Sequence, residues 1–381
     1  MKRVAVFTGK RGGFGAMFGI MDLINNDPEM SLQVIVSDMH LSQKFGATVS
    51  EVEKRYKISA KVDLGDYEDS LIARTSALGR CITELAKALE KLKPHILLLL
   101  GDRGETLAAA FCAVEMGICV AHIQAGDISG GVDDIHRHAI TKLSHIHFSQ
   151  NNSQKLRVLK LGEISDNVYN TGAPYIDNIR SSNLPDFFEV LSKLKIRNPK
   201  NDHFIILHHP DTYNLNESAI QIEAILETFK EVKGNKIVVY PCSDPGYKPI
   251  VNEIKKYSNT EDYYIFKSIE ALDFLSILSN VKAIIGNSSC GIIEAPYLKI
   301  PFILVGERQS GREYGSNVVS ITNDYHNQIL GALNKINEDE FIERINNNHE
   351  IFGDGYSSER IYKVLKNTII DKKLFRKRIT F

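Results

Sequence analysis

The sequence is poor in cysteine and has no long apolar run, and each shortage excludes a class of protein. Its 381 residues include five cysteines, with no Cys-x-x-Cys pair among them. This odd, scattered set offers neither a disulfide framework nor a zinc site, and it predicts reduced thiols in the cytoplasm. No stretch approaches the roughly 18 apolar residues of a membrane helix. The apolar run within residues 1–8 is too short for a secretory signal.

The sequence also lacks an excess of charge of either sign. Its 46 Lys and Arg residues are balanced by 47 Asp and Glu residues, which leaves a net charge of −1. No broad basic field exists to recruit nucleic acid or an anionic membrane, so any anion must be bound locally by a loop or a helix end. With 43% hydrophobic residues, the chain can form sizeable cores. Its length predicts two domains.

Ten short apolar runs, rich in β-branched residues, alternate with amphipathic helical stretches such as 71–92 and 220–232. The runs are 4–8, 32–36, 95–100, 119–123, 145–148, 204–207, 236–240, 263–266, 283–285 and 302–305. This alternation predicts parallel sheets covered by helices on both faces. Polar and turn-forming residues between 180 and 202 separate two such series. We therefore predict two doubly wound α/β domains, 1–180 and 181–355.

Ligands of such folds bind at the carboxyl ends of the strands, so residues that follow the apolar runs are the first candidates. The glycine-rich stretch 9–15 follows the first run and carries Arg11, which could pair with a phosphate. The stretch fits neither the dinucleotide fingerprint nor the P-loop. Asp38, after the second run, could still bind a ribose, so NAD remains a possible ligand. The glycines could also serve only close packing of strand and helix.

Acidic residues follow the next two strongly apolar runs. Asp102 comes after 95–100 and is either an acid/base group or a helix N-cap. Gln124 and Asp127 follow 119–123, and Asp133 and Asp134 come after a glycine turn. Crowded carboxylates shift one another's pKa values, so one can act as an acid and another as a base. The four histidines at positions 136, 138, 145 and 147 lack the spacing of a metal site, so we predict no metal.

In the second half, polar residues again follow predicted strands. His208 and His209 follow 204–207, and one of them could reach a ligand. The run 283–285 leads into Gly286, Asn287, Ser288 and Ser289. Two hydroxyls and free N–H groups at a helix start suit a diphosphate, and a Ser N-cap is compatible with that role. Glu294 is placed to accept from a ribose hydroxyl, and Arg308 and Arg312 add positive charge.

Six motifs occur in an order that is specific when they are taken together. They are Gly101-Asp102-Arg103, the segment 122–134, the segment 137–142, His209-Pro210, Gly286-Asn287-Ser288-Ser289-x-Gly291 and Gly306-x-Arg308. This set resembles the UDP-N-acetylglucosamine 2-epimerase family, especially its hydrolysing branch in sialic and legionaminic acid synthesis. The resemblance runs from the first strand to about residue 365.

The resemblance implies a glycosyltransferase-B fold, with two Rossmann-like domains facing a central cleft. It also implies that the C-terminal helix and tail, 356–381, cross back to the first domain, and that the protein is a homodimer or homotetramer. The substrate would be a nucleotide sugar, with no nicotinamide, metal or other cofactor. In this branch the C2 proton is removed and UDP leaves, giving a glycal-type intermediate. Water then adds at C1, and a proton returns to the opposite face of C2.

The resemblance also suggests roles for individual residues. Asp102 would be an acid/base or orienting group, and Asp133 or Asp134 would be the acid that precedes Arg137. His209 would lie near the leaving phosphate, with Ser288, Ser289 and Glu294 in the nucleotide-binding segment.

Two departures from the family pattern matter. The hydrolysing branch commonly reads His-Ile-x-Gly-Gly-Glu where this chain reads His-Ile-Gln-Ala-Gly-Asp over 122–127. Gln124 occupies the position of the acid in the non-hydrolysing branch and cannot exchange protons, which favours hydrolysis and makes Asp127 the candidate for proton transfer. The first loop, 11–15, lacks the carboxylate that is usual there, which bears on sugar specificity.

Several alternatives stay open at this point. The substrate could be a nucleotide-linked 2,4-diacetamido-2,4,6-trideoxyhexose, or the enzyme could be a non-hydrolysing epimerase. A glycosyltransferase of the same fold would need an acceptor. An NAD-dependent epimerase would carry bound nicotinamide, and a nucleotide-sugar sensor would bind without turnover.

Overall fold

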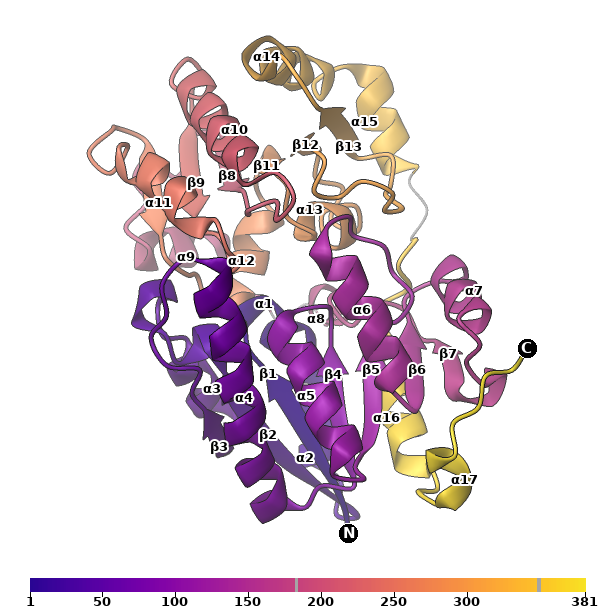
Figure 1. Cartoon of the computed structure of the whole chain (residues 1–381). Coiled ribbons are helices and arrows are strands. Elements are labelled where there is room, and N and C mark those ends of the chain that lie inside the picture. The colour runs from indigo at the N-terminus through magenta and orange to yellow at the C-terminus, as the bar shows by residue number, and fades with distance from the viewer. Residues whose placement is uncertain (182–183, 348–350) are drawn as a thin grey trace. The chain divides into compact units, whose positions relative to one another are not determined.

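The structure is a computed structural model that describes residues 1–181, 184–347 and 351–381. The chain divides into two compact units, each built on a parallel sheet (Figure 1). Unit 1 comprises Met1–Ile128, Val132–Arg180 and Phe352–Phe381, and unit 2 comprises Ser129–Gly131 and Ser181–Ile351. The predicted α/β architecture with two parallel sheets is confirmed.

The unit 1 sheet has seven parallel strands in the order β3-β2-β1-β4-β5-β6-β7. They are β1 (Lys2–Thr8), β2 (Met30–Ser37), β3 (Ile58–Val62), β4 (Ile96–Leu100), β5 (Cys119–Ile123), β6 (Ile146–Ser149) and β7 (Val168–Asn170). The strand order reverses between β1 and β4. In open α/β sheets, such a reversal places the ligand crevice at the carboxyl ends of the strands on either side of it.

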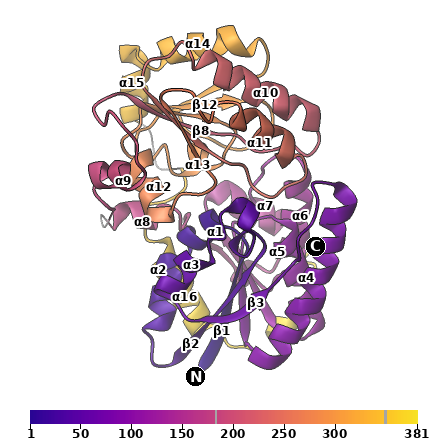
Figure 2. The same ribbon diagram turned by 90° about the vertical axis from the view of Figure 1, so that its left-hand side faces the viewer.

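Helices cover both faces of this sheet, with α4 on one side and α2 and α16 on the other (Figure 2). The unit 1 helices are α1 (Arg11–Ala16), α2 (Phe18–Asn25), α3 (Val49–Arg55), α4 (Leu71–Leu92), α5 (Gly104–Glu115), α6 (Val132–Leu143), α7 (Asn152–Lys160), α8 (Asp177–Arg180), α16 (Ser357–Asn367) and α17 (Lys372–Phe375). Leu85 of α4 and Ala109 of α5 pack with Leu97 and Leu99 of β4 in one core. Burial of this apolar surface holds α4 and α5 on the sheet.

The C-terminal segment packs within unit 1. Tyr362 on α16 donates a hydrogen bond of 2.5 Å to Asp27, just after α2. The Lys2 ammonium donates to the carbonyls of Leu365, Lys366 and Thr368 at the end of α16. A cation at the carboxyl end of a helix satisfies carbonyls that lack intrahelical partners. These contacts join the end of the chain to β1 and α2.

Unit 2 has six parallel strands in the order β10-β9-β8-β11-β12-β13. They are β8 (His203–Leu207), β9 (Asn235–Val239), β10 (Tyr263–Phe266), β11 (Ala283–Gly286), β12 (Phe302–Val305) and β13 (Val318–Ile321). The helices are α9 (Phe187–Lys193), α10 (Leu215–Thr228), α11 (Tyr247–Lys255), α12 (Ala271–Leu278), α13 (Cys290–Ile293), α14 (Tyr325–Lys335) and α15 (Asp339–Asn346). Ile206 of β8, Ile285 of β11 and Phe229 after α10 share one core. The order again reverses, here between β8 and β11, so these two strand ends flank the expected ligand site.

Two further observations bear on the predictions from composition. All five cysteines are free, and only Cys242 is not buried. In the part of the chain that the structure describes, no helix is long and apolar enough to cross a membrane.

Candidate active site

The carboxyl ends of β4 and β5 bring the acidic residues of unit 1 together. The two strands pair in parallel as far as Leu100 and Ile123, and the Gly101 N–H donates to the Ile123 carbonyl at 3.1 Å. Gly101 has a φ of +87°, a conformation that only glycine adopts without strain. The residues that follow, Asp102 and Gln124, therefore leave the sheet side by side.

Arg137 on α6 is the centre of the predicted acidic cluster. Its side chain is fully buried and forms an ion pair with the Asp102 carboxylate, while its Nη1 donates to the Gln124 carbonyl at 3.3 Å. Burial alone would lower the pKa of Arg137, but the nearby charges of Asp102, Asp127, Asp133 and Asp134 raise it. The structure thus gathers the four predicted carboxylates around one permanent cation.

The pairing with Arg137 bears on the N-cap interpretation of Asp102. The N-cap residue of α5 is Arg103, and its side chain makes no capping bond. The Asp102 carboxylate is instead held by a guanidinium from another helix, so the N-cap interpretation is wrong.

Asp127 is buried, and both of its carboxylate oxygens accept hydrogen bonds. Its Oδ1 accepts from the Ile128 N–H at 2.9 Å, and its Oδ2 accepts from the Gln124 side-chain amide at 3.1 Å. Gln124 has a φ of +73°, which is uncommon for a residue other than glycine and is often found at functional sites. The backbone conformation at Gln124 directs its carbonyl towards Arg137. The Gln124 side chain, in turn, donates to the Asp127 carboxylate and so orients it.

A buried ion-pair network, which was not predicted from the sequence, lies beside the β1–β4 reversal. Asp38, after β2, lies 3.3 Å from Arg103 and 3.4 Å from Arg74, and accepts a hydrogen bond from Tyr67 at 2.7 Å. Both arginines also pair with Glu105. Two carboxylates and two guanidiniums compensate one another in this buried site.

The network changes the interpretation of two predicted residues. Asp38 is committed to internal partners, so it is not placed to hold a ribose as the NAD alternative required. A Cβ at Gly9 would lie only 2.7 Å from Oε1 of Glu105, so close packing accounts for that glycine.

Arg11 begins α1, and its positive charge acts on His40. Burial first, and then Arg11, lower the pKa of His40 to about 4.

In unit 2, Asn287 joins the ends of the two central strands. It follows β11, and its side-chain amide accepts from the His209 N–H at 2.7 Å and donates to the His209 carbonyl at 2.9 Å. A Cβ on Gly286 would clash with the Leu207 carbonyl of the neighbouring strand, and its φ is +132°. Glycine at this position lets β11 and β8 approach closely enough for Asn287 to hold His209.

The two adjacent histidines have different surroundings. His208 is fully buried, and burial first and Arg308 second lower its pKa to about 3, so it is neutral. Nδ1 of His209 accepts the Cys242 N–H at 3.1 Å, so a neutral His209 carries its proton on Nε2. The donor of a neutral His209 therefore lies on the ring nitrogen that does not contact Cys242.

Cationic and amide side chains after β12 close around the same strand ends. Arg308 donates to the carbonyls of Pro210 and Asn287 at 3.1 and 3.3 Å. Gln309 donates to the Asn287 carbonyl at 2.8 Å and accepts from Arg312 at 2.9 Å. Both arginines were predicted site residues, whereas Gln309 was not. The Gln309 amide bonds to Arg312 and to the Asn287 carbonyl, which Arg308 also contacts.

The turn into α13 differs from the prediction. α13 has only four residues, and Ser289 makes no side-chain capping bond. The Cys290 N–H donates to the Ser288 hydroxyl at 3.5 Å, and the Gly291 N–H donates to the Ser288 carbonyl at 3.2 Å. These two N–H groups therefore already have partners within the turn, whereas the prediction was that they would be free. Glu294 follows α13 directly and is almost fully buried.

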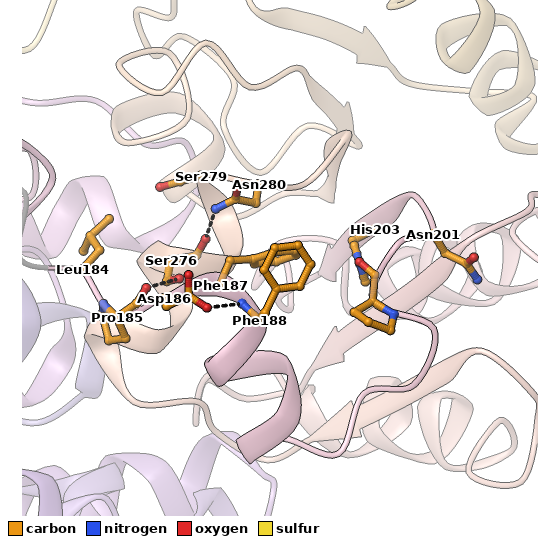
Figure 3. Close-up of a pocket in the computed structure, with 11 residues that line it drawn as sticks. Leu184, Pro185, Asp186, Phe187, Phe188, Asn201, His203, Ser276, Ser279 and Asn280 are labelled. Carbon is orange, nitrogen blue, oxygen red and sulfur yellow. Dashed lines mark hydrogen bonds between the residues drawn. The ribbon is translucent and has the colours of Figure 1, made fainter.

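A pocket of about 470 Å³ in unit 2 lies at the other end of β8, where His203 begins the strand (Figure 3). Its polar groups are bonded within the wall. Ser276 donates to the Pro185 carbonyl, Asn280 donates to the Ser276 carbonyl, and Asp186 caps α9. The pocket contains no predicted site residue, so we do not assign the chemistry to it. Among the residues that the structure describes, no group of three or more His, Cys, Asp or Glu is arranged to hold a metal ion.

Comparisons with known proteins place the chain in a family. The family model described as UDP-N-acetylglucosamine 2-epimerase matches residues 22–366. The UDP-N,N'-diacetylbacillosamine 2-epimerase (hydrolyzing) of Legionella pneumophila is 30% identical over 99% of both chains. The UDP-N-acetylglucosamine 2-epimerase of Neisseria meningitidis serogroup B is 33% identical over 84% of this chain and 83% of its own.

Solved structures show the same fold. The Neisseria meningitidis UDP-GlcNAc 2-epimerase bound to UDP-GlcNAc matches with a TM-score of 0.76 and 23% identity, covering 97% of this chain and all (100%) of its own. The Methanocaldococcus jannaschii enzyme in complex with UDP-GlcNAc and UDP gives 0.74 and 19%, over 96% and 100%. These likenesses confirm the predicted glycosyltransferase-B type of fold. The chain is therefore an enzyme of the UDP-N-acetylglucosamine 2-epimerase family.

Proposed function

We propose that this enzyme is a hydrolysing 2-epimerase that converts UDP-N-acetylglucosamine and water into UDP and N-acetylmannosamine. The observation that carries the proposal is the bonded pair Gln124 and Asp127. An amide at position 124 cannot exchange a proton, whereas the buried Asp127 carboxylate can. Relatives named as hydrolysing enzymes, from Legionella pneumophila and Campylobacter jejuni, are each 30% identical to this chain and support that branch.

The first chemical step is an elimination. The Asp127 carboxylate takes the proton from C2, the C–H electron pair forms the C1–C2 double bond, and the C1–O bond to UDP breaks. A proton next to an acetamido group is very weakly acidic, so general base help of about 10²–10⁴-fold is not enough alone. His209, Arg308 and Arg312 supply the other part by stabilising the negative charge on the leaving diphosphate.

The second step adds water to the glycal-type intermediate. The water oxygen bonds to C1, a carboxylate accepts the water proton, and an acid delivers a proton to the opposite face of C2. Asp133 and Asp134 are the candidates for that acid, and they lie in the first turn of α6. Asp102, paired with Arg137, serves as an orienting group or as the base for water. The net change is one water consumed, with UDP and the epimerised sugar released.

On the nucleotide side we assign Gly286, Asn287, Ser288, Ser289 and Glu294 to UDP binding. Asn287 has no exposed surface and holds the His209 backbone, so its contribution is to shape the turn. Ser288, Ser289 and Glu294 surround the short helix α13, with hydroxyl and carboxylate oxygens suited to phosphate and ribose hydroxyl groups. Arg11 in unit 1 is assigned to the substrate because it begins α1 soon after β1, in a stretch that carries no carboxylate.

A second substrate has its own support. The Legionella relative that is named for UDP-N,N'-diacetylbacillosamine covers 99% of both chains, and the first loop lacks the usual carboxylate. A nucleotide-linked 2,4-diacetamido-2,4,6-trideoxyhexose is therefore the alternative substrate for the same chemistry.

Product analysis with the two UDP-sugars in separate reactions tests the proposal. We expect UDP and free N-acetylmannosamine from UDP-N-acetylglucosamine. Turnover of the diacetamido sugar alone would select the second substrate. UDP-N-acetylmannosamine as the product would show a non-hydrolysing epimerase, and UDP release only with an added acceptor would show a glycosyltransferase.

A further inference from the structure

Lys377, in the segment that follows α17, contacts the carboxyl end of α6, the helix that carries Arg137. The Lys377 ammonium donates to the carbonyls of Thr141, Lys142 and Ser144 at 3.1, 2.6 and 2.5 Å. The last carbonyls of a helix have no intrahelical partners and carry partial negative charge. One ammonium thus satisfies three acceptors at this helix end.

A buried carboxylate holds Lys377 in place. Glu163 lies 2.7 Å from Lys377 and 2.5 Å from Lys142, and 3.0 Å from Nε2 of His147. Phe375 packs edge-on against His145, with ring centroids 5.1 Å apart. Because Lys142 also faces Glu163, loss of the Lys377 charge would leave that carboxylate paired. The feature that only Lys377 supplies is therefore the triple contact with the end of α6.

Thr141 connects this helix end to the strand ends of the candidate site. Its hydroxyl lies 3.3 Å from Nδ1 of His122, and Nε2 of His122 lies 2.8 Å from the Gly101 carbonyl. A carbonyl only accepts, so His122 carries its proton on Nε2 and accepts the Thr141 hydroxyl at Nδ1. Burial is the main cause that lowers the pKa of His122 to about 3, so this neutral form persists.

These contacts form a closed chain of hydrogen bonds, called the circuit below. Lys377 donates to the Thr141 carbonyl, the Thr141 hydroxyl donates to His122, and His122 donates to the Gly101 carbonyl. Gly101 immediately precedes Asp102, and Asp102 pairs with Arg137 on the same helix that Lys377 caps. A shift of the last turn of α6 would therefore be transmitted to Asp102 and Arg137 by two routes, along the helix and through His122.

We propose that Lys377 is a positioning residue, which fixes the last turn of α6 and thereby keeps Asp102 and Arg137 in the geometry that turnover requires. The inference rests on the proposed function, because it affects turnover only if this cluster carries out the chemistry. Lys377 itself lies at the far end of α6 from Asp133 and Asp134 and is assigned no contact with substrate.

The test compares Lys377→Met with Lys377→Arg and a matched control, Arg378→Met. Met keeps the length of the stem and removes charge and donors, whereas Arg restores both. Arg378 is the exposed neighbouring cation on the same tail. Turnover with the UDP-sugar, UDP affinity and hydrogen exchange of α6 in the ligand-free protein are measured for each variant.

We expect Lys377→Met to lower kcat about tenfold, because small misplacements of catalytic groups reduce rates strongly. UDP affinity should not change, since the residues assigned to UDP lie outside this circuit. Exchange in the last turns of α6 should become faster, and Lys377→Arg should recover both properties. Arg378→Met should behave as the wild-type protein.

Two results would overturn the proposal. One is that Lys377→Met matches Arg378→Met in kcat and in α6 exchange. The other is that Lys377→Met lowers melting temperature, UDP affinity and kcat together with no recovery in Lys377→Arg, which would show a general structural role. If the wild-type protein turns over neither UDP-sugar, the proposed function fails, and the exchange data still decide whether Lys377 holds α6.

Discussion

The side-chain amide of Gln124 donates to Oδ2 of Asp127 at 3.1 Å, within a turn whose backbone at Gln124 has a positive φ. The Ile128 N–H holds the other carboxylate oxygen. The amide is thus a fixed donor, and the carboxylate beside it is the group that can gain and lose a proton. This relationship underlies the assignment of Asp127 to proton transfer.

Replacing Asp127 by Asn tests that assignment with a side chain of the same size. We expect kcat to fall by about 10²–10⁴-fold, the usual contribution of a general acid or base. UDP affinity, measured by calorimetry, should stay unchanged because Asp127 is assigned no contact with the nucleotide. Full activity of Asp127→Asn would remove Asp127 from the mechanism.

The buried pair Asp102 and Arg137 predicts non-additive effects on stability. Arg137→Met leaves the Asp102 carboxylate without its guanidinium, and breaking a buried ion pair typically lowers the free energy of unfolding by about 3–5 kcal/mol. We expect the lower end of that range, because the Asp102 side chain is 14% exposed. Adding Asp102→Asn should restore part of the stability but none of the activity. Urea unfolding of the two single variants and the double variant measures the coupling, and strictly additive losses would contradict it.

The glycine-rich stretch after β1 offers a matched pair of substitutions. At Gly9, a new Cβ would lie 2.7 Å from Glu105, whose carboxylate is held by two arginines and cannot move away easily. At Gly12, a Cβ would meet nothing within 4 Å. We expect Gly9→Ala to lower the free energy of unfolding by about 1–3 kcal/mol, as overpacking does. Gly12→Ala should be near neutral in the same urea titration, and equal effects would refute the packing interpretation.

Glu163 predicts a dependence of stability on pH. Burial alone would raise its pKa, but hydrogen bonds from His147, Lys142 and Lys377 lower it to about 2 from a usual value of 4.5. The unfolded chain therefore binds this proton at a higher pH than the folded one, and the stabilisation is present above about pH 4.5 and lost as the pH falls towards about 2. In Glu163→Gln, urea unfolding at neutral pH should show lower stability than the wild-type protein. The difference should shrink near pH 3, and a constant difference would contradict the assignment.

The local sequence pattern predicted the strands that are buried on both faces of the sheets. The central strands are continuous apolar runs, and their ends could be identified because polar residues follow at once, as with Asp102 after β4 and His209 after β8. Three of the four edge strands, β3, β7 and β13, were not predicted. Each includes at least one polar residue, so no continuous apolar run marks them.

The limits of the site prediction have a common physical cause, which is partners distant in sequence. Asp38 looked available for a ribose because nothing nearby in the sequence shows that Arg74 and Arg103 neutralise it. In the sequence nothing distinguishes Gln309 from other loop residues, but in the folded chain its side chain donates to the Asn287 carbonyl. The Arg103-x-Glu105 pair directly after β4 was the one local signal of the buried network.

The most direct test of the account is incubation of the purified enzyme with UDP-N-acetylglucosamine in D₂O, without added cofactor, followed by proton NMR. Removal of the C2 proton and its return from solvent predict UDP and free N-acetylmannosamine that carries deuterium at C2. Release of UDP with the C2 proton retained in the sugar would contradict the elimination and the central role of Asp127.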